Sequence, residues 1–352
     1  MRQRLFITLG MASLAMATFG MKKPKAAIKS LNAATVQQPS YTEWHDLQVN
    51  AINRFPLHTN FFTYSPEDMV YEEGGKLVSR DLAQVNKTMS KNYLSLEGTW
   101  KFNWVENADQ RPTDFYKVDL DDSNWKTMNL PGIWEMNGFG VPEYVNVGFG
   151  WRGHFDQQPP AVPTKDNHVG SYRRIIDIPA NWDGKQVVAH FGSVTSNIYL
   201  YVNGKFVGYA EDSKVAAEFD ITPYLKKGKN LIAFQTFRWC DGSWDEDQDF
   251  WRLSGVAREC YLFARDAKLH LEDIRVTPDL VNNYKDGVLN ISAKVKGTGK
   301  LNFILFDKEG KQVATATGLA KNGTANITMN VENPHKWNAE TPYLYTLQVS
   351  LS

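Results

Sequence analysis

The sequence has little that would point to several common classes of protein. Its 39 Lys and Arg residues balance 39 Asp and Glu residues, so the charge does not indicate a nucleic-acid partner. The seven histidines form no metal-ligand cluster, and the chain has neither a G-x-S-x-G motif nor a glycine-rich phosphate loop before a helix. At 352 residues it is long enough for two or three domains of a soluble globular protein.

Long hydrophobic runs are absent except near the start of the chain. Arg2 and Arg4 precede an apolar run of small residues from Leu5 to Phe19, which is too short to span a membrane. The pattern predicts a secretory signal peptide over residues 1–25 and therefore a periplasmic or secreted protein. We expect no membrane span after signal removal.

Cysteine is scarce. The two cysteines, Cys240 and Cys260, could form a disulfide in an oxidising compartment. Both lie in strand-like stretches, which are more typical of buried free thiols. The sequence leaves both alternatives open.

Alternating apolar residues dominate the rest of the chain and predict an all-β protein. Residues 93–265 form one predicted β domain, residues 266–352 a second, and residues 26–92 an extended N-terminal arm without clear periodicity. Asn203-Gly204 predicts a two-residue hairpin turn, because a type I′ turn needs a positive φ at both positions. Lys308 to Lys311 predicts a second hairpin turn.

The stretch from Phe237 to Gly255 concentrates the polar chemistry of the sequence. It holds five carboxylates among aromatic residues, namely Asp241, Asp245, Glu246, Asp247 and Asp249 beside Trp239, Trp244, Phe250 and Trp251. An EF-hand is excluded, because Phe250 and Val256 replace the glycine and the glutamate that a calcium loop needs. Carboxylates and aromatic faces suit a sugar, with or without a hard cation. The alternative is a solvated acidic turn capped by core tryptophans.

The motif RWCDGSWDEDQDFWRLSGV resembles the signature of the beta-galactosidases of glycoside hydrolase family 2. The resemblance extends through VPEYVNV, VNGKFVGYAEDSK and VENPHKWNAETPYLYTL. It implies a galactose-binding-like jelly-roll sandwich followed by an immunoglobulin-like β-sandwich, of which only five or six of about seven strands can be counted.

The same resemblance implies a sugar site. Asn146 and Val147 match the family residues that touch galactose, and Asp249 matches a residue that binds both galactose and a sodium ion. The alternatives are that Asn146 caps its own turn, and that Asp249 caps a turn or pairs with Arg252.

A second implied site is a magnesium ion between the arm and the next domain. By resemblance its ligands are Glu43, Asp46, Glu211 and Asp241; the alternative is that these are ordinary surface carboxylates. In the family the arm also helps subunits meet, so the resemblance implies a homo-oligomer.

The implied activity is hydrolysis of terminal non-reducing beta-D-galactose from beta-galactosides such as lactose, with retention of configuration. That mechanism needs two carboxyl groups about 5 Å apart. In the family both are glutamates on a (β/α)8 barrel of about 250 residues, and no such stretch occurs in this sequence. We therefore expect this chain to require a barrel region as a partner and to be inactive alone. The alternatives are a stand-alone, non-catalytic carbohydrate-binding module and a structural subunit.

Overall fold

The computed structural model describes residues 38–65, 87–153, 155–321 and 323–352. The predicted signal peptide and the first residues of the arm lie outside these ranges. Within them every strand pairing is antiparallel, and the helices are single 3-10 turns of three or four residues. None of the described helices is long and apolar enough to cross a membrane. The all-β prediction is confirmed.

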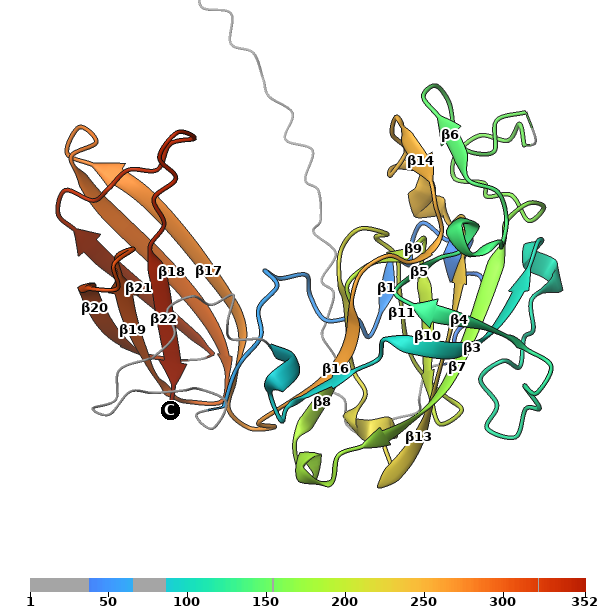
Figure 1. Ribbon diagram of the computed structural model, residues 1–352, viewed down its shortest axis with the longest axis horizontal. Coiled ribbons are helices and arrows are strands. Elements are labelled where there is room, and N and C mark those ends of the chain that lie inside the picture. The colour runs from blue at the N-terminus through green and yellow to red at the C-terminus, as the bar shows by residue number, and fades with distance from the viewer. Residues whose placement is uncertain (1–37, 66–86, 154, 322) are drawn as a thin grey trace, which may run out of the picture. The chain divides into compact units, whose positions relative to one another are not determined.

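The first unit consists mainly of a seven-stranded and a four-stranded sheet (Figure 1). The larger sheet runs in the order β1 (Ala51–Ile52), β11 (Lys205–Ala210), β10 (Ile198–Val202), β13 (Gly228–Phe237), β7 (Val169–Ile178), β3 (Gly98–Val105) and β4 (Lys126–Leu130). The smaller sheet runs in the order β12 (Ala217–Asp220), β8 (Gln186–Phe191), β16 (Cys260–Arg265) and β2 (Tyr93–Ser95). This arrangement matches a jelly-roll sandwich.

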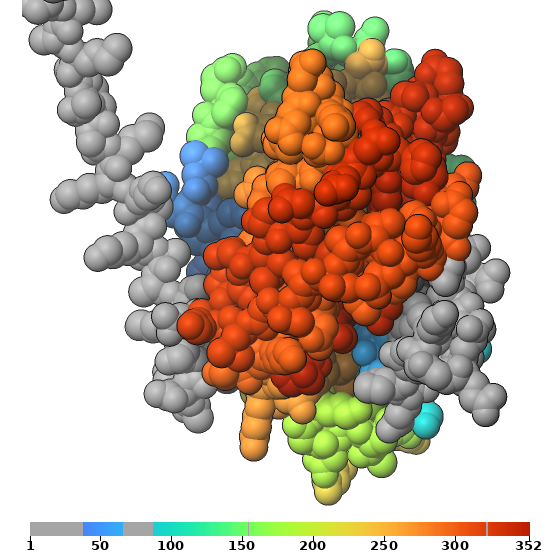
Figure 2. All heavy atoms as spheres, turned by 90° about the vertical axis from the view of Figure 1, so that its left-hand side faces the viewer, coloured from blue at the N-terminus to red at the C-terminus, as the bar shows by residue number. Residues whose placement is uncertain are grey.

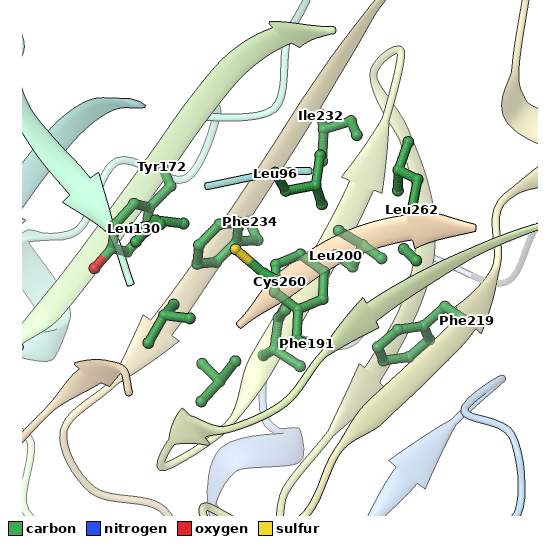
Figure 3. Close-up of a cluster of buried hydrophobic side chains, with 14 of the residues drawn as sticks. Leu96, Leu130, Tyr172, Phe191, Leu200, Phe219, Ile232, Phe234, Cys260 and Leu262 are labelled. Carbon is green, nitrogen blue, oxygen red and sulfur yellow. The ribbon is translucent and has the colours of Figure 1, made fainter. Parts of the chain in front are cut away.

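The hydrophobic core of this sandwich joins residues from both sheets. Figure 3 shows Phe191 of β8, Phe234 of β13 and Cys260 of β16 gathered in one cluster. Their side chains are at most 1% exposed. Burying large aromatic side chains is the main favourable contribution to folding, at about 1.5–3 kcal/mol for each large apolar residue.

The opposite face of the large sheet is also covered. Tyr199 and Tyr201 alternate with the core residues of β10, and they pack in a second cluster with Trp44 of the arm and Phe115. Because both faces of β10 are buried, all five of its residues are buried. The arm is therefore part of the sandwich and contributes β1, which pairs with β11.

The predicted turn at Asn203-Gly204 joins β10 to β11. Their φ angles are 52° and 79°, which is the left-handed region that a type I′ turn requires. Tyr201 pairs with Phe206 and Val202 with Lys205 next to the turn. The hairpin prediction is confirmed.

The second unit has six described strands in two three-stranded sheets. One sheet runs β17 (His270–Val281), β18 (Asp286–Lys296) and β21 (Thr324–Val331), and the other β20 (Gln312–Leu319), β19 (Lys300–Phe306) and β22 (Thr346–Leu351). Its core includes Ile291, Leu301 and Phe303. Figure 2 shows one face of this unit in orange and red. The predicted turn between β19 and β20 is confirmed, and six strands are one fewer than the roughly seven of an immunoglobulin sandwich.

Both cysteines are free and buried. Cys260 lies in the first core cluster and Cys240 in the second. Burial raises the pKa of Cys260 to about 12 and raises the pKa of Cys240 well above its ordinary value. Of the two alternatives, the structure therefore contains buried thiols and no disulfide.

Candidate functional site

A two-stranded ribbon brings the predicted sugar-binding residues together. β6 (Glu143–Val145) pairs with β14 (Phe250–Arg252), and Val145 lies opposite Phe250 (Figure 1). Asn146 and then Val147 follow Val145 of β6, and Asp249 directly precedes Phe250 of β14. Residues about one hundred positions apart in the sequence thus reach the same end of one ribbon.

The ribbon presents an exposed carboxylate beside exposed rings. The Tyr144 hydroxyl donates a hydrogen bond to Asp249 Oδ1, and this hydrogen bond raises the pKa of Tyr144. Tyr144 is 53% and Trp251 54% exposed, and their ring centroids lie 5.6 Å apart in an edge-on arrangement. Asp249 and Val147 are exposed as well. The arrangement can offer a sugar both an acceptor and an aromatic face.

Arg252 forms its ion pair with Asp247 and not with Asp249. The alternative in which Asp249 pairs with Arg252 is therefore wrong. Burial raises the pKa of Asp247. The Asp247 to Arg252 pair fixes the base of β14 and leaves the carboxylate of Asp249 available at its end.

Two of the four aromatic residues expected around the sugar have a different role. Trp239 and Trp244 pack edge-on against Trp151, with ring centroids 5.4 and 4.7 Å from it. The Trp244 indole Nε1 also donates to the Ala161 carbonyl oxygen at 2.9 Å. These two rings hold the long loop before β7 in place, so Trp251 is the ring of the four that is mainly exposed.

Buried carboxylates form a second candidate site. Ligand atoms of Glu211, Cys240 and Asp241 lie within 4.8 Å of one another. Burial, and to a smaller extent the neighbouring Asp241, raise the pKa of Glu211 to about 9. A hydrogen bond from the Tyr209 hydroxyl, 2.5 Å from Glu211 Oε1, acts in the opposite direction. Burial likewise raises the pKa of Asp241. Two carboxylates held this closely need a proton or a cation between them.

The arm brings the other two predicted ligands to the same region. After burial, the Asp46 charge also raises the pKa of Asp241, so the two carboxylates lie within electrostatic range of one another. Glu43 is buried and accepts a hydrogen bond from the Tyr199 hydroxyl at 3.1 Å and one from the Ser40 backbone nitrogen at 2.6 Å. Oxygen ligands of this kind fit magnesium, whereas the Cys240 thiol is too soft for it. The donor chemistry therefore fits the implied ion, with Glu211 and Asp241 as the two closest carboxylates.

Two residues were missed by reasoning from the sequence. Tyr144 lies in the quoted VPEYVNV segment but was given no role, and Tyr209 lies in the quoted VNGKFVGYAEDSK segment. Strand alternation could have placed Tyr209 on the same face as Glu211, two residues later. No local signal shows that Tyr144 meets Asp249, because that contact depends on the pairing of β6 with β14.

The fold and the ribbon define a class of proteins with two antiparallel β-sandwiches in tandem. The first sandwich carries exposed carboxylate and aromatic groups on a ribbon at its rim. Comparison with known families narrows this class. Residues 93–266 match the sugar binding domain of the glycosyl hydrolases family 2, and residues 269–352 match a second model of the same family. The chain belongs to glycosyl hydrolases family 2.

Several curated relatives are beta-galactosidases. The chain is 36% identical over 330 residues to a beta-galactosidase of Priestia megaterium, which covers 90% of this chain and 31% of the relative. It is 37% identical over 317 residues to a beta-galactosidase of Halalkalibacterium halodurans, and the match covers 89% of this chain and 30% of the relative. A beta-galactosidase large subunit of Leuconostoc lactis is 31% identical, and the match covers 87% of this chain and 48% of the relative. The chain thus spans between about a third and a half of these relatives.

Solved structures share the fold. A Bifidobacterium dentium beta-glucuronidase has a TM-score of 0.57 at 17% identity, covering 75% of this chain and 46% of that one. A Bacteroides uniformis beta-glucuronidase 2 has a TM-score of 0.58 at 22% identity, covering 74% and 30%. At these identities the likeness concerns the fold.

Proposed function

We propose that this chain is the sugar-binding and immunoglobulin-like region of a beta-galactosidase that releases terminal non-reducing beta-D-galactose from beta-galactosides such as lactose. The observation that carries the proposal is the convergence of Asn146, Val147 and Asp249 at the open end of the β6–β14 ribbon. The beta-galactosidase names of the relatives support it. The two catalytic glutamates of the retaining mechanism belong to a barrel region outside this sequence.

In this proposal Asp249 binds the galactose. Its carboxylate accepts hydrogen bonds from sugar hydroxyls, while the exposed ring of Trp251 offers an apolar surface beside it. A sodium ion next to Asp249 would share one carboxylate oxygen and take a sugar hydroxyl as a further ligand. Asn146 supplies an amide that can donate to one hydroxyl and accept from another.

The proposal includes three further elements that rest on the family. Magnesium binds among Glu211, Asp241, Asp46 and Glu43, the protein is periplasmic or secreted, and the complete enzyme is a homo-oligomer. The paired buried carboxylates support the first element, because Glu211 and Asp241 lie close enough to need a proton or a cation between them.

A stand-alone carbohydrate-binding module is the second candidate. It is favoured by the exposure of Asp249, Tyr144 and Trp251, which leaves the ribbon open to a sugar without a barrel. Both candidates predict galactose binding by the ribbon. They differ in whether turnover appears when a barrel region is added.

Galactose titration of the full chain, followed by tryptophan fluorescence, tests the ribbon. We expect weak binding that Asp249→Asn reduces by about ten- to a hundredfold, because a hydrogen bond to a charged group contributes about 1.5–3 kcal/mol. Asp245→Asn is the matched control, since Asp245 is an exposed carboxylate of the same loop. Equal affinity in the two variants would contradict the assignment of Asp249.

Turnover of a chromogenic galactoside separates the two candidates. The chain alone should give none, and addition of a family barrel region should restore it. If a barrel region associates with the chain and turnover still does not appear, the stand-alone module is the better description.

A further inference from the structure

A small pocket lies below the β6–β14 ribbon, apart from the exposed carboxylate of Asp249. It has a volume of about 40 Å³. Its walls include Ser213 and Lys214, which follow β11, Arg238, which follows β13, and Arg252 of β14. The space can hold a few atoms and is too small for a hexose.

Arg238 reaches this pocket with an unsatisfied donor. The side chain is 4% exposed, and its Nη2 donates to Glu143 Oε2 at 2.8 Å. Its Nε, however, has no hydrogen-bond partner among the described residues. A buried donor on a charged group is costly to leave without an acceptor, so an acceptor is expected beside it.

Ser213 contributes a second unsatisfied group. The residue is 1% exposed and its backbone nitrogen donates to Glu246 Oε1 at 2.6 Å. Its hydroxyl Oγ has no partner within the described part of the chain. Two buried donors from different segments therefore line one small pocket.

Charged residues of both signs surround the pocket. Lys214, Arg238 and Arg252 line it together with the carboxylates Glu246 and Asp247. Asp247 is paired with Arg252, and Glu246 binds the Ser213 backbone. Lys214 Nζ lies 3.5 Å from Thr195 Oγ1, and burial lowers the pKa of Lys214, against the raising effect of Glu246. Because Arg238 pairs with Glu143 and Arg252 with Asp247, Lys214 is the cation of this lining without an ion pair among the described residues.

We propose that this pocket is a binding site for a small monovalent anion, either a halide or a carboxylate group. Arg238 Nε, Ser213 Oγ and Lys214 Nζ are the donors that hold it. Such an ion satisfies both unpartnered donors at once. Because Phe250 and Arg252 of β14 also line the pocket, the bound anion stabilises the base of the ribbon that carries Asp249.

The test uses the full chain at constant ionic strength. Chloride replaces gluconate while the melting temperature is recorded, and bromide-soaked crystals are examined for anomalous scattering. We expect a chloride-dependent rise in melting temperature and a bromide peak between Arg238 and Ser213. A parallel titration with formate distinguishes a halide site from a carboxylate site.

Two substitutions identify the donors. Lys214→Gln should weaken chloride binding by about tenfold or more, and Ser213→Ala should weaken it less while preserving the charge. Lys205→Gln, at an exposed lysine of β11, is the matched control and should bind as the wild type does. Two of the three substitutions are at exposed lysines, and the third only removes a hydroxyl group. If one variant is unstable, the other two therefore still allow the comparison.

Three results would overturn the inference. These are equal stabilisation of the wild type and Lys214→Gln by chloride, ordered water instead of bromide in the pocket, and bromide confined to exposed lysines. Each would contradict an anion held by these three donors.

Discussion

At the scale of single residues, burial sets the chemistry of Glu211. Glu211 is 6% exposed and its pKa is raised to about 9, whereas Asp249 is exposed at the end of its ribbon. Glu211 therefore holds a proton at pH 7 when no cation is bound. The two candidate sites differ for this reason in what each can bind.

Removal of divalent cations should make the stability of the chain depend on pH through Glu211. Its folded-state pKa is raised, so its contribution is complete below the ordinary pKa of 4.5 and is lost as the pH rises toward about 9. In a chelator, Glu211→Gln should therefore flatten the fall in melting temperature between pH 5 and 9.

Magnesium provides the second half of that experiment. It should raise the melting temperature of the wild type at pH 8, because a cation replaces the proton between Glu211 and Asp241, and it should have little effect on Glu211→Gln. Asp245→Asn serves as the control and should respond as the wild type does. An equal response of all three proteins would place the magnesium elsewhere.

At the scale of elements, the arm is held against the first sandwich by contacts that differ in kind. β1 pairs with β11, and Trp44 stacks on Phe237 with ring centroids 5.1 Å apart. Further along the arm, His58 Nε2 lies 2.9 Å from Glu218 Oε2, and His190 Nδ1 lies 2.7 Å from the other oxygen of that carboxylate. Although burial acts to raise it, the pKa of Glu218 is lowered to about 2 by these two hydrogen bonds.

The His58 contact should make docking of the arm weaker at high pH. Both ring nitrogens face acceptors, with Nδ1 2.8 Å from the Thr59 carbonyl oxygen, so only the protonated ring donates to both. The hydrogen bond to Glu218 raises the pKa of His58. Its contribution is therefore complete below the ordinary pKa of 6.5 and is lost as the pH rises through the raised value.

Hydrogen exchange of residues 51–62 at pH 6 and pH 9 measures this effect. We expect less protection at pH 9 in the wild type after correction for intrinsic exchange, and no such difference in His58→Gln. His45→Gln, at an exposed histidine of the same arm, should behave as the wild type does. Arg265 also attracts the Glu218 carboxylate, but this attraction is present at both pH values and does not contribute to the difference in protection.

Local chemistry explains which elements could be predicted from the sequence. The hairpin at Asn203-Gly204 was predicted because its conformation depends on two adjacent residues, and β10 because its apolar residues follow the pleat. The roles of Trp239 and Trp244 could not be predicted in this way. Their burial depends on Trp151, which lies far away in the sequence and meets them only after the long loop folds back.

The candidate site shows the same division. The family motif singled out Asn146 and Asp249 as candidates, and their roles stay a prediction. It could not predict whether Arg252 pairs with Asp247 or with Asp249, since that choice depends on how β14 leaves its loop. The arm appeared to lack strands because β1 has only two residues. A strand this short is defined by its partner β11 and not by its own alternation.

At the scale of the whole described chain, the hydrophobic cores are separate. The clusters around Phe234 and around Tyr201 contain only residues up to Ala264, and the cluster around Phe303 contains only residues from Leu269 onward. Each sandwich thus has the core that an independently cooperative unit requires.

Single core substitutions should therefore affect one unfolding transition at a time. Phe303 is fully buried in the second unit, and replacing a buried Phe by Ala typically costs about 3–5 kcal/mol. In calorimetry, Phe303→Ala should lower the melting temperature of one transition and leave the other unchanged. Phe234→Ala, the matched change in the first sandwich, should do the reverse. If both substitutions lower a single shared transition by similar amounts, the two cores are energetically coupled, and loss of the second sandwich would then also disturb the ribbon that carries Asp249.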